Sequence, residues 1–269
     1  MTFIPLSLSD IAIASILLVI SGGLSIALRL GLTQNIAVSA VRMVLQLAAV
    51  ALLLKFIFEV NSPLWTALFA VVMFAGAVYE TVSRQRRRLP GWQTYLLGAA
   101  PQLFVGIMAT VIAGAAIIGG DVWYAPRYIL PILGMVLGNT MSGVSLVLDT
   151  MTEGVSRERG AVEARLALGA GRFTAMGDVL RRSVTTALMP ILSSMAATGI
   201  VALPGMMTGQ ILAGINPIDA AKYQVMILLL ISGATAIAVI ASGVGAVMLL
   251  TDERHRLRLD RLSATSASR

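Results

Sequence analysis

The sequence has no cysteine, a single histidine and few charges. Without cysteine, disulfide bonds, iron–sulfur ligation and thiolate metal sites are excluded. The one histidine, His255, lies in the basic C-terminal segment, so it cannot form a catalytic or metal site at membrane depth. Charged residues make up 12% of the chain and hydrophobic residues 57%, against about 25% and about 45–50% in soluble globular proteins. This is the composition of an integral membrane protein.

The sequence also lacks a phosphate-binding loop. That loop requires a glycine directly before its lysine, and the only two lysines, Lys55 and Lys222, follow Leu54 and Ala221. The chain therefore does not bind ATP through this motif. If the protein is a transporter, its energy comes from elsewhere.

Seven apolar segments are long enough to cross a bilayer, which takes about 20 residues of helix. They predict an all-α polytopic membrane protein with about seven transmembrane helices. The N-terminal run is predicted to stay as the first helix, because no basic residue precedes it as in a signal peptide. The predicted spans are 10–28, 36–58, 63–80, 94–118, 128–148, 186–203 and 222–250.

The arginines are distributed unevenly among the connections. They supply nearly all of the net charge of +7 and gather in the first, third and fifth connections and in the C-terminal tail. Such residues mark the cytoplasmic side, so the N-terminus is predicted outside and the C-terminus inside, and no nucleic-acid partner is needed to explain the charge. The predicted organisation is a permease domain over 1–250, with a cytoplasmic loop at about 149–186, and a basic cytoplasmic tail over 251–269.

Few polar side chains lie inside the predicted spans. Arg42 is the one deep charge, and Gln46 follows it by four residues on the same face of the second helix. Arg42 either extends its guanidinium to the membrane surface or faces the pathway or a neighbouring helix. Asn139 lies in the middle of the fifth span, where hydrogen bonding between helices is the usual role. The spans hold no carboxylate at their centres, so an acid–base pair for a membrane-embedded enzyme is not available.

The fifth connection contains "ERGAVEARLALGAGRF". Residues 161–168 are predicted to form a short surface helix that Gly169 and Gly171 end. A second, basic helix is predicted from Arg172 and enters the membrane at Thr186. By itself this pattern is also typical of an amphipathic helix lying on the membrane surface.

The segment "LPGMMTGQILAGINPIDAAKYQ" interrupts the apolar sequence after the sixth predicted span. Pro204 and Gly205 are predicted to end the sixth helix, a short apolar helix follows, and Asn216 caps a last helix that begins at Pro217. The segment is either an outer gate beside a pathway or a plug that packs the helices. Its methionines are either soft metal ligands or apolar filler, so a metal site stays open. The candidate residues are Pro204, Gly205, Met206, Met207, Gly209, Gly214, Asn216 and Pro217.

The amino-acid sequence of the fifth connection resembles a known motif. "EARLALGA" is similar to the EAA loop of ABC-transporter permeases, with Glu163, Ala164 and Gly169 at matching positions and Arg165 in place of the third motif residue. The proline usual in that loop is out of register here. The resemblance implies that Glu163, Ala164, Arg165, Gly169 and Arg172 couple the chain to an ATPase partner.

Three longer stretches resemble the FetB (YbbM-type) permeases, iron exporters of the ABC class: "LPGMMTGQILAGINPIDAAKYQVMI", "VRMVLQLAAVALLLKFIF" and "ILPILGMVLGNTMSGVSL". The resemblance implies a non-enzymatic permease subunit in the bacterial inner membrane, surrounded by lipid and without a cofactor of its own. Two copies would assemble with two separate ATPase subunits that bind and hydrolyse ATP, and the cargo would be iron or another metal. A nucleotide sugar or a lipid-like cargo, and a stand-alone channel or facilitator, are the alternatives.

Overall fold

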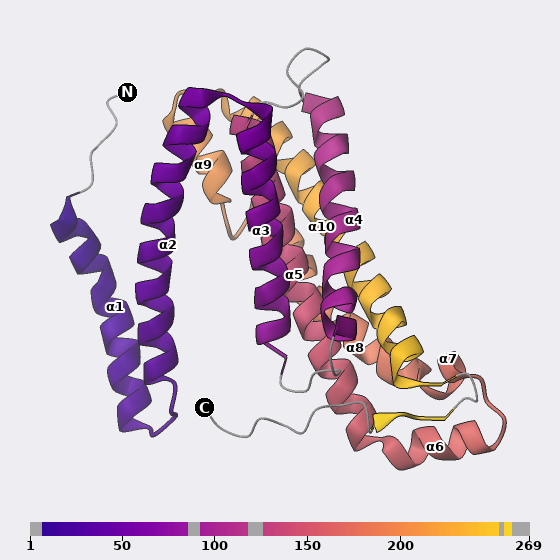
Figure 1. Cartoon of the computed structure of the whole chain (residues 1–269). Coiled ribbons are helices and arrows are strands. Elements are labelled where there is room, and N and C mark those ends of the chain that lie inside the picture. Colours follow the sequence, from indigo (N-terminus) through magenta and orange to yellow (C-terminus); the bar gives the residue numbers. More distant parts are fainter. Residues whose placement is uncertain (1–6, 86–91, 118–125, 253–255, 260–269) are drawn as a thin grey trace. The chain divides into compact units, whose positions relative to one another are not determined.

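The structure is a computed structural model that describes residues 7–85, 92–117, 126–252 and 256–259. These residues are almost entirely helical (Figure 1). The helices are α1 (Leu8–Ala27), α2 (Thr33–Val60), α3 (Pro63–Ser83), α4 (Trp92–Ile117), α5 (Pro126–Arg157), α6 (Arg159–Ala167), α7 (Arg172–Ala175), α8 (Gly177–Ala197), α9 (Gly205–Leu212) and α10 (Pro217–Leu250).

Six helices in the described part of the chain are long and apolar enough to cross a membrane: α1 to α5 and α10. This confirms an all-α, multi-pass membrane protein. Each of the six overlaps one of the predicted spans over nearly the whole length of that span. Helix α5 is the one that differs most, because it continues to Arg157, beyond the predicted end at residue 148. The first part of the predicted cytoplasmic loop is therefore helical and continuous with a span.

The remaining predicted span, 186–203, corresponds to α8, and its predicted end is wrong. Helix α8 begins at Gly177 and ends at Ala197. The backbone leaves the helix at Thr198, with φ −65° and ψ 130°, and Gly199 then adopts a φ of +92°, which favours glycine. The chain thus turns several residues before Pro204, which was predicted to stop the helix. Polar residues on the exposed side of α8 keep it out of the set of six apolar helices.

The chain divides into two compact units, and the first consists of Met1–Ser62 with Leu212–Gly214. Within it, α1 and α2 form an antiparallel pair joined by a tight turn. Arg29 and Gly31 have positive φ angles of 52° and 70° in this turn. The buried Ser25 closes it, since its carbonyl accepts from the Leu30 N–H at 2.9 Å and its hydroxyl from the Leu32 N–H at 3.1 Å.

The second unit, Pro63–Ile211 with Ile215–Arg269, is built around α5. Helix α5 contacts α3, α4, α8 and α10, and it contributes much of the buried core. Gly143 permits a close approach of α10, because a Cβ at this position would lie 2.8 Å from Cγ2 of Val239. The same Cβ would lie 3.9 Å from the backbone oxygen of Ala187 in α8. Three helices therefore meet at one glycine.

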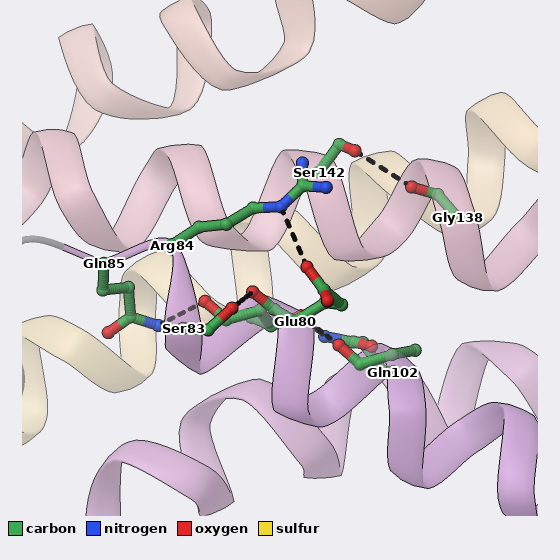
Figure 2. A network of polar contacts seen from close by, with 9 residues as sticks. Glu80, Ser83, Arg84, Gln85, Gln102, Gly138 and Ser142 are labelled. Atoms are coloured by element: carbon green, nitrogen blue, oxygen red, sulfur yellow. Dashed lines mark hydrogen bonds and ion pairs between the residues drawn. The ribbon is translucent and has the colours of Figure 1, made fainter. Parts of the chain in front are cut away.

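Buried polar bonds tie α4 to its neighbours in the second unit. The Gln102 amide donates from Nε2 to the Thr81 hydroxyl at 2.7 Å, which joins α4 to the end of α3. Figure 2 shows this region, where Glu80 and Arg84 form an ion pair at 3.6 Å and the Arg84 guanidinium points toward Ser142 of α5. Such bonds specify how the apolar helices pair, because an unsatisfied polar group inside a core is costly.

The residues after α10 turn back onto the helix end. The Arg258 N–H donates to the Leu250 carbonyl at 2.9 Å, and the Asp252 N–H donates to the Arg256 carbonyl at 3.0 Å. Leu257 and Leu259 then pack against the hydrophobic core. The first part of the predicted basic tail is therefore anchored to the permease domain.

Candidate functional site

Helix α6, Arg159–Ala167, carries the EAA-like residues and packs on the core of the second unit through Val162 and Leu166. Val162 is only 2% exposed and belongs to the core. The helix ends as predicted: Gly169 has a φ of +88°, and the Ala170 N–H donates to the Arg165 carbonyl at 3.0 Å. A residue with a Cβ would be strained at this φ. The glycine sets the direction in which the chain leaves α6.

Two ion pairs connect the α6 region to α8. The Arg165 guanidinium lies 2.8 Å from the Asp178 carboxylate, and Arg182 pairs with Glu158 at the start of α6. Within α6, Arg159 and Glu163 form a further pair at 2.8 Å. Arg165 and Glu163, which the EAA resemblance assigns to partner binding, thus also have partners inside the chain. Their side chains remain about half exposed, at 47% and 44%.

An exposed apolar surface follows α6. Leu168 is 88% exposed and Phe173 is 42% exposed. Between α7 and α8 the backbone breaks at Met176, which is fully buried, so the continuous basic helix predicted from Arg172 is wrong. Leu168 and Phe173 were not among the predicted site residues. The sequence feature that could have indicated them is a large apolar residue on either side of the glycines that end α6. We call the surface of α6, Leu168, Arg172 and Phe173 the α6 corner.

The segment after α8 contains the short apolar helix that was predicted. Helix α9 runs over Gly205–Leu212, and Gly214 turns the chain with a φ of +92°. The Asn216 side chain then accepts from the Ile218 N–H at 2.9 Å, with Pro217 as the first residue of α10. The predicted capping is therefore confirmed.

The methionines of α9 do not converge on one point. Met206 packs against the hydrophobic core, and Met207, one residue later, lies about 100° around the helix. Among the described residues, no group of three or more histidines, cysteines or carboxylates is placed to hold a metal. Gly205 and Gly209 face open space, where a Cβ would meet no atom within 4 Å. This geometry favours packing over ligation as the role of the methionine pair.

The polar residues predicted within the spans fall in different units. Arg42 and Gln46 are both exposed on α2 in the first unit. Asn139 is exposed on α5 in the second unit, and its Nδ2 donates to the Met135 carbonyl at 2.8 Å. The site candidates therefore form separate groups: Arg42 and Gln46 in the first unit, the α6 corner and the exposed side of α5 in the second, and the α8–α10 connection, of which residues 212–214 belong to the first unit.

Comparison with known protein families shows to which family the chain belongs. Residues 8–249 match the family described as "Uncharacterised protein family (UPF0014)". The chain belongs to this family. The UPF0014 relatives include the "Probable iron export permease protein FetB" of Escherichia coli K12, which is 30% identical over 255 residues, covering 94% of this chain and 95% of the relative.

Two further UPF0014 relatives are membrane proteins of a cyanobacterium and a plant. The protein slr1647 of Synechocystis is 33% identical over 216 residues, which is 79% of this chain and 81% of the relative. The protein STAR2 of Oryza sativa is 34% identical over 220 residues, which is 81% of this chain and 75% of the relative. No solved structure matches the chain. The resemblance to the FetB-type permeases is thus confirmed, and the chain is a multi-pass membrane protein of a permease family.

Proposed function

We propose that the chain is the membrane-spanning subunit of an ATP-driven exporter of metal cations, with iron as the first candidate cargo. Two copies form one translocation pathway, and each binds one separate ATPase subunit. The cargo is suggested by the name of the relative FetB. The observation that carries the proposal is the α6 corner.

The α6 corner has the properties of a docking surface. It presents Leu168 and Phe173, two large apolar side chains that a protein surface leaves exposed at some cost. Half-exposed charges at Glu163 and Arg165 lie beside them. An apolar centre within a polar rim is typical of protein–protein interfaces. The predicted topology places this surface in the cytoplasm, where an ATPase is found.

The corner is also connected to the membrane helices in a way that could transmit movement. Helix α6 follows α5 after one residue, Glu158. That same residue pairs with Arg182 of α8, and Arg165 pairs with Asp178. A push on α6 by the closing ATPases therefore acts on α5 and α8 together. We propose that this displacement switches the pathway between inward and outward access, with residues 204–217 acting as the outer gate.

Co-purification tests the proposal directly. The C-terminally tagged protein is solubilised gently, and a stoichiometric ATPase is expected in the complex. Gly169→Ala, which strains the turn after α6, and Glu163→Gln should both lower cargo-dependent transport while membrane insertion stays normal. If crosslinking before solubilisation captures no ATPase, or if both variants transport at the full rate, the docking assignment is wrong. A stand-alone channel would then be the better description.

A further inference from the structure

Helix α8 ends well short of its neighbour α5. The two helices run antiparallel: a Cβ on Gly154 would lie 2.8 Å from Val179, and one on Gly143 would lie 3.9 Å from the Ala187 oxygen. At about 1.5 Å per residue, Ala197 is level with about residue 133 of α5. Helix α5 therefore continues for about 10 Å beyond the end of α8.

Helix α10 leads to the same conclusion and locates the break in the membrane. Gly243 lies beside Leu180 of α8, where a Cβ would be 2.9 Å from Cδ1, so α8 ends level with about residue 227. Tyr128 near the start of α5, and Lys222 and Tyr223 near that of α10, are residues typical of the membrane interface. Counted from them, the end of α8 lies about 6 to 8 Å inside that interface.

In the irregular backbone after α8, three of the four N–H groups of residues 198–201 are bonded, whereas their carbonyls are free. The N–H groups of Gly199 and Val201 donate to the carbonyls of Ala202 and Ala197, at 2.9 and 3.0 Å. The four carbonyl oxygens of residues 198–201 accept no hydrogen bond from any described residue. Irregular backbone at membrane depth is found only where protein covers it or where it lines water. The C-terminal end of a helix also carries a partial negative charge.

The exposed side of α8 below this break carries hydroxyl groups among apolar side chains. Thr186, Ser193 and Ser194 are exposed, and their hydroxyls make no hydrogen bond with the described residues. On α5, by contrast, the hydroxyl of the exposed Ser142 donates to the Gly138 carbonyl, four residues earlier, at 3.0 Å. That internal bond is how a hydroxyl is satisfied when lipid surrounds it. The hydroxyls of Thr186, Ser193 and Ser194 on α8 lack this internal bond, which indicates that they face water.

Helix α5 adds a polar side chain to the same surface. Asn139 lies on its exposed side, between the side that meets α3 at Gly134 and the side that meets α8 at Gly143. The Asn139 amide donates its N–H to Met135, and its oxygen accepts no bond from the described residues. Together with the three α8 hydroxyls, Asn139 forms what we call the α5–α8 polar strip: Asn139, Thr186, Ser193 and Ser194.

The strip offers neutral oxygen atoms and no charge. Between Arg182 and Ala197 on α8, and between Arg127 and Asp149 on α5, the sequence has no charged residue. The strip itself provides neither cationic side chains nor a helix N-terminus, the groups that a phosphate-bearing cargo would need. Carbonyl, amide and hydroxyl oxygens are instead the ligands of hard cations.

We propose that the carbonyl oxygens of residues 198–201, at the break between α8 and α9, bind a metal cation in transit, and that the polar strip lines its water-filled approach. The role of this site in export rests on the proposed function. Cation binding itself requires no ATPase.

Thiol labelling tests the water-filled approach, and the chain provides its own cysteine-free background. Ser193→Cys and Asn139→Cys in native membranes should react with a water-soluble thiol reagent at least tenfold faster than Leu192→Cys. Leu192 is the matched control, since it lies on the same helix and is 52% exposed. Equal rates would overturn the proposal. So would a Ser193–Gln46 double cysteine variant that crosslinks fully, because α2 would then cover the strip.

Metal binding tests the carbonyl site on the purified full-length chain in lipid nanodiscs, with Mn²⁺ as the probe. Gly199→Ala, which cannot keep its φ of +92° without strain, should raise the Kd at least tenfold, whereas Gly233→Ala in α10 should leave it unchanged. Neither position has an atom within 4 Å of an added Cβ, so only the backbone conformation differs. The double variant Ser193→Ala/Asn139→Ala should weaken binding less than Gly199→Ala and serves as a second measurement if that variant is unstable.

Absence of Mn²⁺ binding to the native chain, or equal Kd values for both glycine variants, would refute the cation site even if an ATPase co-purifies. Conversely, if the native chain binds Mn²⁺ but no ATPase is captured with it by crosslinking or co-purification, the cation site stands and only the ATP-driven exporter is refuted.

Discussion

The substitution Leu168→Ala at the α6 corner should weaken binding of the ATPase without destabilising the permease. Leu168 is 88% exposed, so removing its side chain should change the free energy of unfolding of the permease by no more than about 0.5 kcal/mol. Burying a leucine side chain in an interface contributes about 1.5 to 3 kcal/mol. If the ATPase covers Leu168 fully, the Kd of the complex should therefore rise about 10- to 150-fold.

The assay measures binding of the separately purified ATPase to the permease in nanodiscs, by biolayer interferometry. Leu192→Ala is the control, since Leu192 is also an exposed leucine but lies at the predicted membrane depth of α8. The reasoning is refuted if Leu168→Ala binds the ATPase with an unchanged Kd. It is also refuted if the control weakens binding as much, because the loss would then not come from the corner.

Three further predictions concern packing and local bonds, each measured by thermal unfolding in detergent. Gly143→Ala should cost about 1 to 3 kcal/mol through overpacking against α10, and Gly138→Ala, which meets no atom within 4 Å, should not; equal losses would contradict the packing argument. A double-mutant cycle on Arg165 and Asp178 should give about 0.2 to 1 kcal/mol, because both side chains are about half exposed, and a value near zero would mean that the pair does not hold α6. Asn216→Ala should cost about 0.5 to 2 kcal/mol through loss of the α10 cap, and an unchanged midpoint would rule that out.

The helical spans could be predicted from the sequence because a bilayer imposes the same length and apolarity on each of them. The prediction failed at α8, where one side of the helix carries polar groups and the hydropathy signal is weak. The apolar run extends past Ala197 to Leu203, so hydropathy alone placed the end of the helix too late. The backbone turns at Gly199, and nothing in the local pattern separates this glycine from those inside other helices.

The sequence alone determined the features that depend on neighbouring residues. The glycine stop at Gly169 and the cap at Asn216 were predicted correctly, because each depends on the backbone preferences of a few adjacent residues. The partner of Arg165 and the exposed position of Asn139 were decided only by the tertiary structure. They depend on which sides of α5 and α8 are covered, and packing between distant segments determines that.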